Sequence, residues 1–178
     1  GKVHTNFLQT GTATGRLSSE KPNLQNIPAN SKWATAIRAV FESSPGATLV
    51  SLDYSQLELR LLAHIVKDRE LIGAFLADKD IHRLTASKIF GTSESAVTDE
   101  MRKIGKTLNF GMIYGMGPRA FGKMSGLSLN DAKKFIESYF ANFPKIKKWQ
   151  DETIRLAKAN GYVKNENGRL RFLPDISS

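Results

Sequence analysis

Apolar residues recur at intervals of three and four through the middle of the chain, which is the spacing of one face of an α-helix. A helix predicted from about Ser55 has its apolar positions at Leu57, Leu61, Leu62 and Ile65. Further helices are predicted near residues 69–77 and 80–90, over Asn130–Phe140, and from Pro144, a residue that suits a first helical turn. One face of this last helix is shared by Ile146, Trp149, Thr153 and Leu156.

The best-marked helix follows Thr98, a residue that accepts well from the free backbone N–H groups of a helix start. Asp99 and Glu100 come next, and their negative charge suits the positive end of the helix dipole. We expect this helix to run to Tyr114 and to stop at Gly115.

Strand signals lie toward the two ends of the chain. The first 30 or so residues are rich in Thr, Ser, Asn, Gly and Pro and predict extended segments and loops. Residues 47–53 predict a short buried strand after the Pro45-Gly46 turn, and residues 162–164 and 169–173 flank a probable hairpin turn at 165–168. The predicted fold class is α+β, a mainly helical insertion held between two β-containing ends.

Composition is that of an ordinary globular protein, with 40% hydrophobic and 24% charged residues among 178. No apolar run is long enough to span a bilayer, and no signal-peptide pattern opens the chain, so no membrane partner is expected. The absence of cysteine excludes disulfides and thiolate metal sites and fits a cytosolic protein.

The net charge of +9 is unevenly distributed along the chain. Residues 1–100 carry 11 basic and 11 acidic side chains, whereas residues 101–178 carry 15 basic and 6 acidic ones. A basic half of this kind favours contact with a polyanion such as nucleic acid. On charge alone, a basic surface that is solvated and binds no nucleic acid is an equally good interpretation.

Four side chains spaced by four residues form a stripe on the helix after Thr98: Arg102, Lys106, Phe110 and Tyr114. Two cations followed by two aromatic rings match the order of parts in a nucleoside triphosphate, a polyanionic tail and a flat base. The alternative is an amphipathic helix whose rings lie in a core. Gly105 and Gly111 favour the ligand, because each glycine costs about 1 kcal/mol inside a helix, a cost that makes sense if a bulky ligand must lie close to the backbone.

Asp53 is expected where the predicted strand ends and the next helix begins. A carboxylate in that position can bind Mg²⁺, but it can equally cap the helix. Glu58, five residues on, is on its own an ordinary solvated glutamate.

Five segments together resemble family A DNA polymerases of the bacterial DNA polymerase I type. Asp53–Arg60 is similar to motif A, and Arg102–Gly115 to motif B on the fingers helix that closes over the nucleotide. The segment that grips primer and template is matched by Thr14–Ser19 with Pro22–Pro28. Asp80–Ala86 and Gly168–Ile176 also match, so the motifs cover practically the whole chain in the family's order.

The resemblance implies template-directed DNA synthesis, the transfer of deoxynucleotides to a primer 3′ end with two Mg²⁺ ions. It implies catalytic roles for Asp53, Arg102 and Lys106, and metal binding by Asp53 with the backbone carbonyl of Tyr54. The implied nucleotide-binding residues are Gln56, Glu58 (the steric gate against ribose), His82, Arg102, Lys106, Phe110 and Tyr114. The implied primer–template contacts are Arg16, Asn23, Gln25, Asn26 and Arg169. Without the resemblance, Arg16 and Arg169 would pass for surface charges and His82 for a structural histidine.

The same resemblance implies three regions: a palm portion over residues 1–60, helical fingers over 61–160, and a hairpin returning to the palm over 161–178. The family's motif C, a His-Asp-Glu segment with the second metal carboxylate, does not occur in this sequence. The thumb and the exonuclease-like domain are not matched either. Expected partners are therefore primer–template DNA and deoxynucleoside triphosphates, in bacterial cytoplasm or a phage or organelle equivalent. The alternative is a nucleotide- and DNA-binding fragment that is catalytically incompetent alone.

Overall fold

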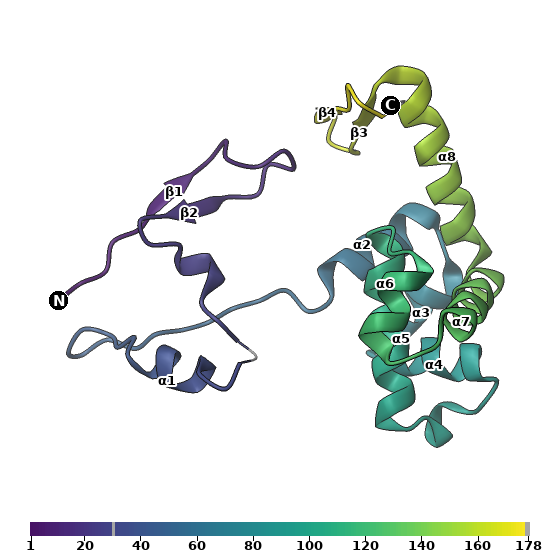
Figure 1. Ribbon diagram of the computed structural model, residues 1–178, viewed down its shortest axis with the longest axis horizontal. Helices are drawn as coiled ribbons and strands as arrows, with labels where there is room; N and C mark the ends of the chain where they lie inside the picture. Colours follow the sequence, from purple (N-terminus) through teal and green to yellow (C-terminus); the bar gives the residue numbers. More distant parts are fainter. Residues whose placement is uncertain (30, 177–178) are drawn as a thin grey trace. The chain divides into compact units, whose positions relative to one another are not determined.

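The structure is a computed structural model that describes residues 1–29 and 31–176 (Figure 1). The chain divides into two compact units, of which one is Gly1–Asp53 together with the residues from Asn160 on, and the other is Tyr54–Ala159.

The second unit is helical. Its helices are α2 (Leu57–Val66), α3 (Arg69–Leu76), α4 (Ile81–Phe90), α5 (Asp99–Ile113), α6 (Pro118–Ser125), α7 (Leu129–Asn142) and α8 (Pro144–Asn160), with a 3₁₀ turn η2 (Glu94–Ala96). Helix α4 packs against α5 and α7, α5 against α6, and α2 against α3. Helix starts are fixed locally: Asp68, Asp80, Thr98 and Ser128 each accept from backbone N–H groups of the first turn.

One hydrophobic core holds these helices together. Its largest fully buried apolar side chains are Tyr139, Phe121, Phe143, Ile81, Leu108 and Ile146, which come from α4 to α8 and their connections. Burial of a side chain of this size contributes about 1.5–3 kcal/mol. The core therefore fixes α4 and α5, the two helices that carry most of the candidate site.

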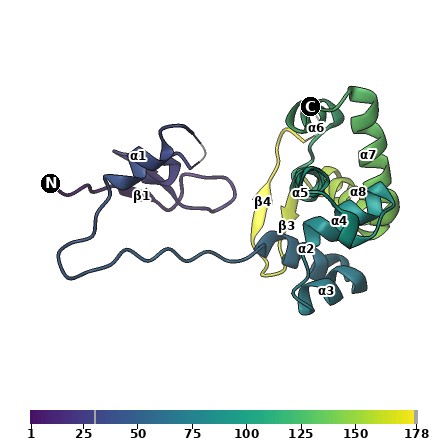
Figure 2. The same cartoon turned by 90° about the horizontal axis from the view of Figure 1, so that it is seen from below.

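The described residues of the first unit form two small antiparallel sheets. In one, β1 (Asn6–Leu8) pairs with β2 (Ser18–Glu20), with Phe7 opposite Ser19. In the other, β3 (Tyr162–Lys164) runs beside β4 (Leu170–Phe172), as Figure 2 shows, with Val163 opposite Arg171. The unit also contains a 3₁₀ turn η1 (Leu24–Asn26) and a short helix α1 (Ala34–Ala39).

Most of the predicted helices are confirmed, among them α5 with its start at Thr98 and its end before Gly115, whose φ is +70°. The predicted hairpin at 162–173 is also confirmed. The structure is mostly helical with two small sheets, in line with the predicted class. Helices α1 and α6 and the β1–β2 pair were not predicted. In the described part of the chain, no helix is both long and apolar enough to cross a membrane.

One prediction of secondary structure is wrong. Residues 47–53 are extended but pair with no strand among those described, and Leu49, Val50 and Leu52 are 66%, 75% and 91% exposed. A strand needs a partner, and residues 47–53 find none within the described ranges. The helix predicted from about Ser55 is confirmed as α2, in which Leu62 is buried while Leu57, Leu61 and Ile65 are 42%, 50% and 37% exposed. This helix has apolar residues on more than one side, so its neighbours decide which side is buried.

Candidate functional site

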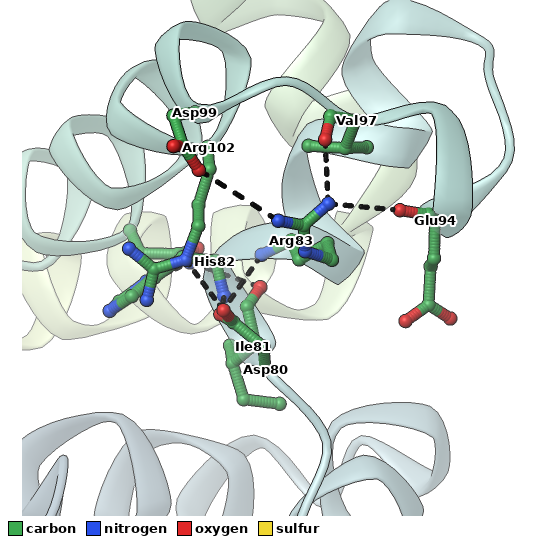
Figure 3. Close-up of polar contacts among 9 residues, drawn as sticks. Asp80, Ile81, His82, Arg83, Glu94, Val97, Asp99 and Arg102 are labelled. Carbon is green, nitrogen blue, oxygen red and sulfur yellow. Dashed lines mark hydrogen bonds and ion pairs between the residues drawn. The ribbon is translucent and has the colours of Figure 1, made fainter.

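The start of α4 is joined to α5 by one carboxylate. Asp80 Oδ1 accepts from the backbone N–H groups of His82 (3.0 Å) and Arg83 (3.1 Å), and Oδ2 accepts from Arg102 Nε at 2.5 Å. Figure 3 shows these contacts converging on Asp80. Burial alone would raise the pKa of Asp80, but the bond from Arg102 and the two backbone N–H groups hold this pKa below its ordinary value. The carboxylate therefore stays charged and fixes the guanidinium of Arg102.

His82 and Asn109 form the second link between α4 and α5. Both are buried, at 4% and 2% exposure. Asn109 Nδ2 lies 3.1 Å from His82 Nδ1, and Asn109 Oδ1 accepts from Thr85 Oγ1 at 3.0 Å. The His82 ring also lies 5.7 Å from the Phe110 ring, centre to centre. Burial lowers the pKa of His82, and nearby Arg102 and Lys106 lower it further, against an opposing effect of Asp80.

The stripe on α5 keeps the geometry that the sequence predicted. Arg102 and Phe110 are half-buried and Lys106 and Tyr114 are exposed, with Phe110 packed at the edge of the core. Arg102 and Lys106 bring two positive charges to the start of α4, where His82 lies, and Asp80 is the acid paired with Arg102. An anion with several oxygens fits such a cluster.

Gly105 and Gly111 have a different role from the predicted one. A Cβ added at Gly105 would lie 2.5 Å from the backbone oxygen of His82 and 3.1 Å from the backbone nitrogen of Ala86. A Cβ at Gly111 would meet Met116, whose Sδ would be 3.0 Å away. The close approach is thus made by α4 and by Met116, and the argument that these glycines make room for a ligand is wrong.

Arg83 fastens the connection between α4 and α5. Its Nη1 donates to the backbone oxygens of Val97 (2.6 Å) and Glu94 (3.3 Å), and its Nη2 lies 4.0 Å from Asp99 Oδ1 (Figure 3). The arginine therefore holds the residues that lead into α5 against α4.

Three predicted nucleotide-binding residues lie at or opposite the start of α2. Tyr114 Oη donates a short hydrogen bond to Glu58 Oε2, which joins the end of α5 to the first turn of α2. Gln56 precedes this helix in a left-handed conformation (φ +52°), and its buried Oε1 accepts from no donor within the described ranges. Such an acceptor has bonding capacity left for a ligand.

The predicted metal ligands are not assembled into a site. Asp53 and Tyr54 lie on an exposed extended segment, and the division between the two compact units falls between them. Among the described residues, no three His, Cys, Asp or Glu side chains come together as a metal site would need. The residues present therefore do not by themselves fit a pair of Mg²⁺ ions.

In the first unit, Arg169 lies against Gly15, the residue that precedes Arg16. A Cβ added at Gly15, whose φ is +81°, would lie 1.9 Å from Arg169 Nη1, so the guanidinium rests on the backbone beside Arg16. One of the predicted amide contacts, Asn23, makes hydrogen bonds within the chain. Its Oδ1 accepts from Ser19 Oγ (2.9 Å) and from the backbone N–H of Gln25 (3.2 Å). The side chains of Asn23, Gln25 and Asn26 are exposed.

Sequence reasoning gave no role to Asp80, Asn109 or Arg83. Asp80 carried a local signal, because an aspartate before a helical pattern is a common cap. Asn109 carried a weaker one, as an amide between Leu108 and Phe110 in a helix. Arg83 carried none, since its partners are backbone oxygens 11 and 14 residues away.

Comparisons with known proteins agree over the whole chain. A sequence model described as "DNA polymerase family A" matches residues 1–178. "DNA polymerase I" of Caldicellulosiruptor bescii and "DNA polymerase I, thermostable" of Thermus aquaticus are each 46% identical over 178 residues, all of this chain and 21% of the relative. A solved structure of the POL domain of Pol1 from M. smegmatis, in complex with DNA primer-template and dNTP, superposes with a TM-score of 0.89 at 36% identity. It is matched over 100% of this chain and 32% of its own. The chain thus spans about a fifth of the length of the curated relatives.

Proposed function

The chain belongs to DNA polymerase family A, and on this basis we propose that its α4–α5 face binds the triphosphate of an incoming deoxynucleotide. The observation that carries the proposal is the cluster of Arg102, Lys106 and His82 at the start of α4, with Phe110 beside it. In the complete protein, this binding serves template-directed transfer of deoxynucleotides to a primer 3′ end.

In this proposal Arg102 and Lys106 neutralise the phosphates, because in-line phosphoryl transfer depends on positioning and on stabilising the developing negative charge. Arg102 exchanges its bond with Asp80 for a phosphate oxygen. His82 is 4% exposed, so a phosphate reaches it only after the surrounding side chains move. Nucleotide binding therefore includes a local rearrangement at the start of α4.

Phe110 packs against the sugar and base, and Tyr114 lies toward the template side. Glu58 occupies the space that a ribose 2′-hydroxyl needs, and its bond from Tyr114 supports a fixed position for this gate. Gln56 lies near the sugar, where its buried Oε1 can accept a hydrogen bond.

Primer–template DNA is the second proposed partner. Arg16 and Arg169 bind near the primer end, and the contact of Arg169 with Gly15 supports their acting together. Asn23, Gln25 and Asn26 contribute amide contacts. Sequence-independent copying needs backbone and minor-groove contacts of this type rather than a base-specific code. The complex of the M. smegmatis relative with primer-template and dNTP supports the same pair of ligands.

Two Mg²⁺ ions are proposed for the complete enzyme, with Asp53 and the carbonyl of Tyr54 among their ligands. Among the described residues no group of three His, Cys, Asp or Glu side chains forms a metal site, and the His-Asp-Glu segment that carries the family's second metal carboxylate does not occur in this sequence. We also propose that residues 61–160 form the helical fingers, with residues 1–60 and 161–178 contributing to the palm. The alternative, a nucleotide- and DNA-binding segment without catalysis of its own, differs only in needing no metal.

The test compares two lysines on α5. Lys106→Ala removes the proposed phosphate contact, whereas Lys103→Ala removes the same charge from an exposed position outside the stripe. A hydrogen bond to a charged group contributes about 1.5–3 kcal/mol. Titration of dATP should show roughly ten-fold or greater loss of affinity in Lys106→Ala and little change in Lys103→Ala. Equal effects of the two variants would mean that only the general charge attracts the nucleotide.

A further inference from the structure

A buried amide touches the one histidine of the candidate site. Asn109 lies in the middle of α5, is 2% exposed, and reaches three groups of α4. Its Oδ1 accepts from Thr85 Oγ1 (3.0 Å), and its Nδ2 lies 3.1 Å from His82 Nδ1 and 3.5 Å from the backbone oxygen of Ile81. A buried amide with this many partners has one defined orientation.

The partners show which end of the amide faces the histidine. The backbone oxygen of Ile81 can only accept, so the nitrogen of Asn109 must face it. That same nitrogen faces His82 Nδ1. An amide nitrogen can only donate, and therefore His82 Nδ1 must be the acceptor and carry no proton.

We propose that Asn109 is a positioning residue that keeps His82 in the tautomer with a bare Nδ1 and the proton on Nε2. In this state Nε2 can donate a hydrogen bond to an oxygen of an anionic ligand. That consequence rests on the proposed function, in which the anion is the triphosphate. The tautomer itself follows from the contacts within the chain.

The charged groups around His82 also favour its neutral form. His82 is faced by Asp80 from α4 and by Arg102 and Lys106 from α5. Burial lowers the pKa of His82, the two cations lower it further, and Asp80 opposes them. Protonation of Nδ1 would also set its N–H against the N–H of Asn109. Near neutral pH His82 is therefore a neutral donor through Nε2, and the two cations supply the positive charge.

The first experiment observes the unchanged chain. Long-range ¹H–¹⁵N correlation spectra of the ¹⁵N-labelled chain at pH 7 distinguish a bare imidazole nitrogen from a protonated one. The chain has three histidines, and His4 and His64 are exposed, so the spectrum is simple and a His82→Gln variant assigns it. We expect a single His82 tautomer with Nδ1 bare. A protonated Nδ1, or an even mixture of tautomers, would overturn the proposal.

Asn109→Asp tests the cause, because it has nearly the same shape but presents an acceptor where Nδ2 stood. Its carboxylate should draw a proton onto His82 Nδ1 and raise the pKa of this histidine above that of the unchanged chain. An unaltered Nδ1 signal in the folded variant would contradict the role of Asn109. His4 and His64 serve as internal references.

Addition of dATP to the unchanged chain separates the two proposals. A shift of the His82 Nε2 signal on saturation supports both. If the tautomer is as expected but dATP leaves Nε2 unmoved, the assignment of Asn109 stands and the phosphate contact of His82 in the proposed function fails.

Discussion

The packing of α4 on α5 depends on the missing side chain of Gly105, and an alanine there should destabilise the helical unit. In Gly105→Ala the new Cβ would lie 2.5 Å from the backbone oxygen of His82. Real Cβ atoms do not come this close, and the obstacle is backbone, which cannot turn aside as a side chain can. Helix α4 must therefore move away from α5, with loss of the contacts on both helices.

The loss of stability in Gly105→Ala is best measured against a matched control at Gly73. Gly73 lies within α3, is exposed, and a Cβ added there would meet nothing within 4 Å. Alanine in place of glycine inside a helix gains about 1 kcal/mol at either position. Overpacking at Gly105 costs about 1–3 kcal/mol. Gly73→Ala should thus be stabilising, and Gly105→Ala should be about 1–3 kcal/mol less stable than Gly73→Ala.

Thermal unfolding followed by circular dichroism at 222 nm measures this difference. For a chain of this size, 1 kcal/mol corresponds to a change in Tm of roughly 2–4 °C. Gly105→Ala should melt several degrees below Gly73→Ala, and dATP should bind it more weakly. A Gly105→Ala chain as stable as Gly73→Ala would refute the close packing of α4 and α5.

Three further outcomes are expected. Asp80→Ala removes both the helix cap and the bond from Arg102, and should lower the free energy of unfolding in urea by about 1–2 kcal/mol. Asp80→Asn keeps the cap and should lower this free energy by less than about 1 kcal/mol. Equal losses in the two variants would show that the cap does not stabilise the helix. The pKa of Asp80 lies below its ordinary 3.8, so the stability due to its charge is present above pH 3.8 and is lost as the pH falls through the lower folded value. The difference between the unchanged chain and Asp80→Asn should accordingly shrink in urea unfolding between pH 5 and pH 3, and a constant difference would assign no role to the charge. Primer extension by the 178 residues alone should be negligible, because the sequence lacks the His-Asp-Glu segment with the family's second metal carboxylate and the described residues form no group of three possible metal ligands; robust extension that Asp53→Ala abolishes would contradict this.

Local signals explain which parts of the fold could be predicted. Thr98 at the start, regular spacing within, and Gly115 at the end all lie in one stretch of sequence, so α5 was predicted nearly to the residue. The β3–β4 hairpin was predicted for the same reason, because its turn and both strands are adjacent. The stripe from Arg102 to Tyr114 needed only helical geometry.

The remaining features depend on residues distant in sequence. Residues 47–53 have the composition of a strand, yet a strand forms only where a partner lies alongside. The bond between Asp80 and Arg102 spans 22 residues, and that between His82 and Asn109 spans 27. Gly105 was read correctly as a point of close approach, but the sequence could not show that α4, rather than a ligand, makes the approach.

The central claim is that a nucleotide binds at the meeting of α4 and α5, and backbone amide shifts on titration with dATP test it most directly. The largest saturable shifts should fall on residues 80–83 and 102–110, with only small ones at the exposed α8 residues Lys147, Lys148 and Arg155. In Lys106→Ala the same residues should shift, but saturation should require a higher concentration of dATP. Shifts concentrated on α8, or a titration that does not saturate, would contradict the account.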